Sequence, residues 1–271
     1  MGKIIGKCAL CKKEELELLQ SHIIPKFTYK RLAQYPNSRF RNYYKLNDIF
    51  QDGEKKPLLC SGCEGFFSKF EVKFVNGVLD KYLNNKKNEI DKKKYDDFIF
   101  SLNWRIIYDG IFNLKSFDKT SPIHQPFYEM EELMWTYLDA RRREIEHPQI
   151  DNIKNYIIFM EEFKLGEQYK EMFKSSTFGY SFSADNNSKY IVMTYFLGVI
   201  CVTVYELKNV IIIDSIVNKI RRLFKYSFLK NIIENELNYN YKKMIEQASK
   251  NEEILSKGLR DKIKKRYENK K

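Results

Sequence analysis

The sequence contains little glycine or proline, with 11 and 6 residues in a chain of 271. Collagen-like and low-complexity chains are rich in both, so this composition excludes those classes. Apolar residues make up 43% of the chain and aromatic residues 15%, which argues against intrinsic disorder. We therefore expect a well-buried core, in one large domain or two small ones.

Long apolar runs are also missing. The longest, residues 190–205, is shorter than the ~20 residues that a membrane-spanning helix requires, and Gly198 interrupts it. We interpret this run as two buried β-strands. The opening residues, MGKIIGKCALC, contain no apolar segment of the length found in secretory signals. We therefore predict a cytoplasmic protein without a membrane span.

Only five cysteines occur, and four of them form two C-x-x-C pairs, Cys8 with Cys11 and Cys60 with Cys63. In a chain without an export signal, such pairs indicate metal binding and not a disulfide framework. Each pair places two thiolates on a tight turn, and two turns complete the tetrahedral shell that Zn²⁺ prefers. We predict a structural zinc ion on these four cysteines and a core position for Cys201.

Positive charge is in excess and is concentrated at the two ends of the chain. The formal net charge is +12. Residues 1–63 carry 12 basic and 6 acidic side chains, residues 64–218 carry 20 and 23, and residues 219–271 carry 16 and 7. An anionic partner is expected, and nucleic acid is the commonest partner of a basic soluble protein. A merely solvated, lysine-rich surface is the alternative.

The distribution of apolar residues predicts an α+β protein. Helical spacing marks residues 95–112, residues 126–147 and the segment that follows Cys63. β-Branched and aromatic runs separated by turn residues predict an antiparallel sheet over about residues 153–214. From residue 228 onward we expect a long amphipathic helix, or a pair of helices, with a basic end.

The order of motifs near the N-terminus resembles that of the HNH endonuclease family, which has the treble-clef ββα-metal fold. A first cysteine pair is followed by an extended segment ending in Ser21-His22, and Leu59 then precedes the second pair and a helix. The segments SHIIPKF, QDG, LLCSGCE, FSKFE and SLNWR are also similar to bacterial HNH-like proteins of unassigned role. The resemblance covers roughly residues 1–110.

This resemblance implies a zinc-binding ββα-metal module at residues 1–85. Residues 86–271 would then form a body of helices, the antiparallel sheet and the long C-terminal helix. The implied activity is metal-dependent cleavage of phosphodiester bonds, in DNA in preference to RNA, and the implied setting is bacterial defence against phage. His22 would be the general base that takes a proton from water, a task suited to imidazole with its unperturbed pKa of ~6.5.

Three carboxylates are candidates for holding a catalytic Mg²⁺ or Mn²⁺ ion, because Ser21 precedes His22 where the family has Asp or His. Glu64 and Glu71 are two helical turns apart and share a helix face, and Asp52 lies in the QDG segment. Carboxylate oxygens are the ligands that Mg²⁺ prefers. The alternatives are a helix N-terminal charge for Glu64, a surface position for Glu71, a turn for Asp52 and core packing for His22.

Residues 26–47 are predicted to be a loop-rich segment that contacts nucleic acid. They contain no acidic residue and interleave aromatic residues with cations. Cations bind phosphates and rings stack on bases. The alternative is that the rings pack inward and the cations are solvated. The cations are Lys26, Lys30, Arg31, Arg39, Arg41 and Lys45.

Two other functions fit the same sequence. In the first, the zinc module binds nucleic acid without cutting it. In the second, the β-rich C-terminal half binds protein, in a homodimer or in an effector complex.

Overall fold

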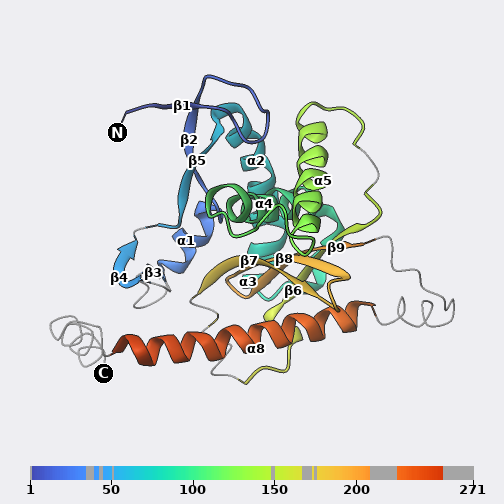
Figure 1. The fold of residues 1–271 in the computed structure, drawn as a ribbon. Helices are drawn as coiled ribbons and strands as arrows, with labels where there is room; N and C mark the ends of the chain where they lie inside the picture. Colours follow the sequence, from blue (N-terminus) through green and yellow to red (C-terminus); the bar gives the residue numbers. More distant parts are fainter. Residues whose placement is uncertain are drawn as a thin grey trace. The chain divides into compact units, whose positions relative to one another are not determined.

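The computed structural model shows a mixed α+β protein (Figure 1). Two compact units are present, one made of Met1–Tyr35 and Gly53–Ile213 and the other of Pro36–Asp52 and Asp214–Lys271. The structure describes residues 2–34, 40–42, 45–50, 52–147, 150–166, 173, 176–207 and 225–252.

A small antiparallel sheet opens the first unit. Its strands are β1 (Ile4–Gly6), β2 (Leu16–His22) and β5 (Lys55–Cys60), in the order β1-β2-β5. Strand β5 leads directly into helix α2 (Ser61–Phe74), which has Cys60 as its N-cap. The two cysteine pairs are therefore carried by the turn between β1 and β2 and by the junction of β5 with α2.

The segment that follows β2 is helical, and our expectation of a loop-rich segment was wrong there. Helix α1 (Lys26–Leu32) begins after Pro25, whose fixed φ suits a helix start, and it buries Thr28, Tyr29 and Leu32. Further along, β3 (Phe40–Asn42) and β4 (Lys45–Phe50) form an antiparallel hairpin in the second unit.

Helix α2 continues through a π-helical turn, η1 (Val75–Leu79), into α3 (Asp80–Leu83). Two 3₁₀ turns follow, η2 (Lys87–Glu89) and η3 (Lys92–Tyr95). The apolar positions of α2 that face the core, Phe67 and Phe74, are fully buried. The helix predicted after Cys63 is thus confirmed.

Helix α4 (Asp96–Tyr108) is the centre of the first unit. It ends in a second π-helical turn, η4 (Asp109–Asn113), and packs against α2, α5 (Gln125–Arg142) and the larger sheet. Phe98 stacks on Phe74 of α2 with ring centroids 3.9 Å apart. Each polar group on a helix that is buried on all sides needs a hydrogen-bond partner, and α4 carries several such groups.

The predicted antiparallel sheet is confirmed for the described residues. Its strands are β6 (Ile153–Phe159), β7 (Thr177–Ala184), β8 (Lys189–Phe196) and β9 (Val199–Glu206), in the order β6-β9-β8-β7. Strands β8 and β9 are rich in β-branched and aromatic residues and are almost wholly buried. The part of the prediction beyond residue 207 lies outside the described residues.

The turn between β8 and β9 consists of Leu197 and Gly198, which both have positive φ, 52° and 83°. Two left-handed residues are the pattern of a type I′ turn, which matches the twist of the strands. A Cβ on Gly198 would lie 2.3 Å from the hydroxyl oxygen of Tyr82. Glycine is therefore required there for conformation and for space.

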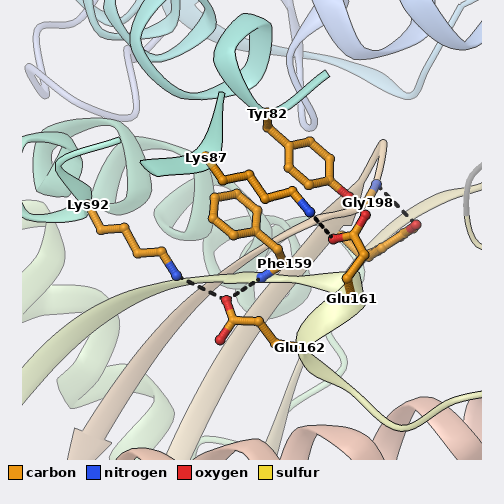
Figure 2. Close-up of polar contacts among 8 residues, drawn as sticks. Tyr82, Lys87, Lys92, Phe159, Glu161, Glu162 and Gly198 are labelled. Carbon is orange, nitrogen blue, oxygen red and sulfur yellow. Dashed lines mark hydrogen bonds and ion pairs between the residues drawn. The ribbon is translucent and has the colours of Figure 1, made fainter. Parts of the chain in front are cut away.

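Tyr82 fastens the helical segment to this edge of the sheet, as Figure 2 shows. Its ring stacks on Phe159 with centroids 4.8 Å apart and planes 6° apart. Its hydroxyl donates to Glu161 Oε1 at 2.8 Å, and Lys87 Nζ lies 3.1 Å from Glu161 Oε2. Polar contacts therefore flank the stacked rings of Tyr82 and Phe159.

Lys92 contributes a second ion pair next to the Phe159 ring (Figure 2). Its Nζ donates to Glu162 Oε1 at 3.0 Å and lies 4.5 Å from the centroid of the Phe159 ring. The backbone N–H of Phe159 also donates to Glu162 Oε1, at 3.0 Å. The charged groups are therefore paired with each other, and we assign the cluster a structural role.

The C-terminal helix is described as α8 (Lys225–Glu252). Leu229, Ile233 and Leu237 are buried and are spaced by four residues, as expected for an amphipathic helix. Most of the basic residues predicted at its end lie beyond residue 252, outside the described residues. Within the described chain, no helix has the length and apolar character needed to cross a membrane.

Candidate metal centre and the site beside it

The four paired cysteines converge at one point. Their sulfur atoms all lie within 4.8 Å of one another, and the Cys11 and Cys60 sulfurs are 4.0 Å apart. With Zn–S bonds of about 2.3 Å, a tetrahedral shell requires sulfurs roughly 3.8 Å apart. The cluster is therefore close enough to hold a metal ion such as zinc.

The first pair lies on a tight turn that is tied to the second. Lys12 N donates to Cys8 O at 2.9 Å, and Lys12 adopts the left-handed conformation with φ of 57°. Ala9 N donates to Leu58 O at 3.0 Å, and Cys60 N donates to Cys8 Sγ at 3.4 Å. Backbone contacts thus hold the two turns together.

The environment of the cluster favours thiolate at Cys8. A hydrogen bond from the Cys63 thiol lowers the pKa of Cys8 to about 4, against burial, with help from the N–H groups of Cys60, Cys11 and Leu10. The same hydrogen bond raises the pKa of the donor Cys63, and burial raises the pKa of Cys11. Thiolate is the form that binds metal.

The cysteine cluster is also fixed to the body of the first unit. The indole N–H of Trp135 in α5 donates to Leu10 O at 2.8 Å. Lys12 Nζ lies 5.2 Å from the Trp135 ring and 5.6 Å from the Tyr108 ring. Contacts with Trp135 and Tyr108, both distant in the sequence, therefore hold the turn of Cys8 and Cys11 against α5 and α4.

His22 is the last residue of β2 and is half-buried. The ring of Tyr29 lies 6.2 Å from the imidazole, centroid to centroid. The backbone of His22 is also held, because its carbonyl oxygen accepts a hydrogen bond from Arg105 Nη1 at 3.0 Å. Strand β2 thus ends at a residue whose main chain is anchored to α4.

Arg105 is a residue that sequence reasoning missed. Its side chain is 1% exposed. Besides His22 O, it donates to Ser101 O at 3.1 Å and to Glu71 Oε1 at 2.9 Å. Its guanidinium lies 5.5 Å from the Phe67 ring. The SLNWR motif contains this arginine, but nothing local in the sequence indicates that it reaches β2.

Two polar residues near His22 are engaged in the fold. Glu71 is the ion-pair partner of Arg105, so a metal ion at this carboxylate would compete with a buried guanidinium. Ser21 is buried, and its Oγ accepts from Leu59 N at 3.2 Å. This bond lies beside a register shift between Leu19 and Gln20, so the hydroxyl satisfies a backbone donor next to an irregularity of the ladder.

Glu64 stands out among the predicted carboxylates. It lies in the first turn of α2, and its Oε1 is buried without a hydrogen-bond partner among the described residues. A buried carboxylate oxygen that lacks a donor is costly unless a cation or another donor reaches it. Asp52 belongs to the second compact unit.

No family model, curated protein or solved structure matched the chain.

Within the described residues, the four cysteines are the group of three or more His, Cys, Asp or Glu side chains that lie close enough to share an ion. His22 and the predicted carboxylates do not form a second group of that kind. A second ion would therefore depend on one or two protein oxygens, with water or substrate oxygens completing its shell, as is usual for Mg²⁺.

The predicted nucleic-acid contacts divide into three sets. Lys26 and Lys30 are exposed on α1. Arg31 is paired with Asp80 at 2.6 Å. Phe27, one of the interleaved aromatics, packs against Phe98 and Phe196 at 6.2 and 5.9 Å, which fits inward packing for this ring.

Two of the remaining cations of that segment belong to the β3–β4 hairpin. The backbone of Arg41 lies in β3 and that of Lys45 lies in β4. Arg39 lies outside the described residues. Gly53, in the QDG segment, packs under Tyr29, because a Cβ there would lie 1.9 Å from the Tyr29 ring.

Proposed function

We propose that this protein is a metal-dependent endonuclease of the HNH type, with His22 as its general base. The observation that carries the proposal is the combination of a four-cysteine cluster with an antiparallel strand pair, β2 and β5, that runs into α2. His22 lies at the end of β2, where its main chain is held by Arg105. A general base must be held in a fixed place, and this strand end is fixed.

In the proposed reaction, the neutral imidazole of His22 accepts a proton from a water molecule. The water oxygen forms a bond to phosphorus, and the bond from phosphorus to the leaving sugar oxygen breaks. A divalent ion, when bound, stabilises negative charge on the phosphate and on the leaving oxygen. Glu64 is the protein oxygen best suited to hold that ion, because its Oε1 is buried and has no described donor.

The substrate proposed is DNA in preference to RNA, since the resemblance to HNH proteins is to DNA-cutting enzymes. Lys26 and Lys30 are exposed on α1, which begins four residues after His22, and would contact backbone phosphates. A role in defence against phage is proposed on the same resemblance.

The test is cleavage by the purified full chain in Mg²⁺ or Mn²⁺, with supercoiled plasmid, single-stranded DNA and RNA as substrates. A His22→Ala variant should cut about 10²- to 10⁴-fold more slowly than the parent protein, because this is the usual contribution of a general base. His147→Ala is the matched control, because His147 is exposed and its described ring contact is with Tyr137, at 4.7 Å. This control should cut at the rate of the parent protein.

Failure to cut any of these substrates in either metal would contradict the proposal. So would a His22→Ala variant that cuts as fast as the parent protein.

A zinc module that binds nucleic acid without cutting it is the second candidate. The hydrogen bond of Ser21 and the ion pair of Glu71 favour it, because both interactions stabilise the fold. This candidate predicts salt-dependent binding that is unchanged in His22→Ala and weakened when Lys26 and Lys30 are replaced by glutamine.

A further inference from the structure

Two neighbouring lysines of β5 project from opposite faces of the ladder between β2 and β5. Lys55 is directly opposite His22, and Lys56 is directly opposite Ser21. Residues opposite each other in an antiparallel pair project from the same face with Cβ atoms about 4.5–5.5 Å apart. Successive residues of a strand project from opposite faces. Lys55 therefore shares the face of His22, and Lys56 lies on the face of the buried Ser21.

Lys56 has a structural role on its own face. Its Nζ lies 3.0 Å from Glu54 Oε1 and 3.9 Å from Oδ1 of the buried Asp109. Lys55 is exposed and is the last residue of β5 to pair with β2. A lysine side chain is long enough to place its ammonium beyond the imidazole of a cross-strand neighbour.

We propose that Lys55 binds the backbone phosphate on which His22 acts. This inference rests on the proposed function and names a residue of the same site. An ammonium is a compact point charge that proteins use to bind phosphate. In the transition state, negative charge grows on the phosphate oxygens as the water oxygen bonds to phosphorus, and a cation fixed there stabilises it.

The surroundings of the pair fit an anionic ligand. Between His22 and Gln34 the chain carries no acidic residue, and the carboxylate of Glu54, which precedes Lys55, is paired with Lys56 at 3.0 Å. Lys26 and Lys30 are four residues apart on α1 and so share one exposed side of that helix. The strand end itself is rigid, because Arg105 holds His22 O and Glu54 O accepts from Ile23 N at 3.1 Å.

The first test measures binding, without cleavage, in a His22→Ala background. Affinity for a short fluorescein-labelled DNA duplex is measured by anisotropy over a range of salt concentrations. Adding Lys55→Gln should reduce the slope of log affinity against log salt by about one, as expected for the loss of one phosphate contact. Lys55→Arg should restore the slope, because arginine also carries a cation.

Lys94→Gln is the matched control. Lys94 is exposed on η3, where it pairs with Asp91 at 3.2 Å, and its replacement removes the same charge from the protein. It should leave the slope unchanged. Equal slopes in the Lys55→Gln and parent backgrounds, or an equal fall in the Lys94→Gln variant, would overturn the proposal.

The second test uses the cutting protein with His22 present. Lys55→Gln should lower kcat about 10²-fold and Lys55→Arg should recover most of it, if the ammonium acts on the reacting phosphate. A kcat for Lys55→Gln equal to that of the parent protein would overturn this role. If the parent protein does not cut, the proposed nuclease function fails, whereas the salt slopes still decide whether Lys55 binds phosphate.

Discussion

The small sheet and the large sheet of the first unit are stabilised in different ways. In the small sheet, apolar side chains remain exposed, with Ile5 at 59% and Leu19 at 39%. In the large sheet, strands β8 and β9 are almost wholly buried. The small sheet buries little apolar surface of its own, so we expect the cysteine cluster and the contacts with α4 and α5 to stabilise it.

Each sheet also has its own buried polar anchor on α4. Arg105 serves the small sheet through His22 O and Glu71. Asn103 serves the large sheet, where its Nδ2 donates to Thr203 Oγ1 at 2.9 Å and its Oδ1 accepts from Thr194 Oγ1 at 2.7 Å. One helix therefore joins the sheet that carries the cysteine cluster to the sheet that depends on hydrophobic burial.

The largest effect is expected from loss of one thiolate. Cys60→Ser should abolish zinc binding and unfold β2 and β5, because binding of a structural zinc contributes on the order of 10 kcal/mol in small modules. The amides of β8 and β9 should stay protected. Metal content by atomic absorption and hydrogen exchange by mass spectrometry measure the two outcomes.

Cys201→Ala is the control for this variant, since Cys201 is buried in β9 away from the cluster and should leave the zinc content unchanged. A Cys60→Ser protein that keeps its zinc and its exchange pattern would show that the small sheet does not depend on the cluster.

A smaller effect is expected at Arg105. Arg105→Met should lower the free energy of unfolding by about 3–5 kcal/mol, because it leaves Glu71 without its buried partner. Urea denaturation measures the loss. Adding Glu71→Gln should recover part of it, since the uncompensated carboxylate is removed.

Arg142→Met is the matched control for Arg105. Arg142 is 25% exposed, against 1% for Arg105, and its partner Asp139 also has Arg143 at 3.6 Å, so its loss should cost no more than about 1 kcal/mol. Equal costs for the two arginines would contradict an anchoring role for Arg105.

The smallest of the three effects is expected at Asn103. Asn103→Ala leaves the hydroxyls of Thr194 and Thr203 without this partner and should cost about 2–3 kcal/mol. The unfolding transition should stay cooperative and the zinc content unchanged, because the large sheet retains its apolar core. Loss of zinc in this variant would show that the two sheets are not stabilised separately.

Local pattern was sufficient to predict much of this molecule. Two C-x-x-C pairs predicted the cysteine cluster, and helical spacing after Cys63 predicted α2, because both features are encoded within a few residues. β-Branched runs predicted the large sheet. Helix α1 was missed because its aromatic and basic residues fit a binding loop as well as a short helix that follows Pro25.

Long-range contacts were not predictable. Arg105 and His22 are 83 positions apart, and no periodic pattern connects them. The bond from Leu59 N to Ser21 Oγ depends on a register shift in the ladder, which side-chain alternation does not reveal. The partner of Glu71 was likewise invisible, since a surface carboxylate and an ion-paired one look the same in sequence.

The type I′ turn at Leu197 and Gly198 has a consequence for the order of folding. Strands β8 and β9 are joined by these two residues, and such a hairpin closes locally within about 1–10 μs. Strands β2 and β5 must instead pair although α1 and the β3–β4 segment lie between them in the sequence. The cysteine cluster also joins residues that precede β2 to residues at the end of β5. We expect the hairpin to form early and the small sheet to assemble afterwards against α4, so that the strand carrying His22 becomes ordered late in folding.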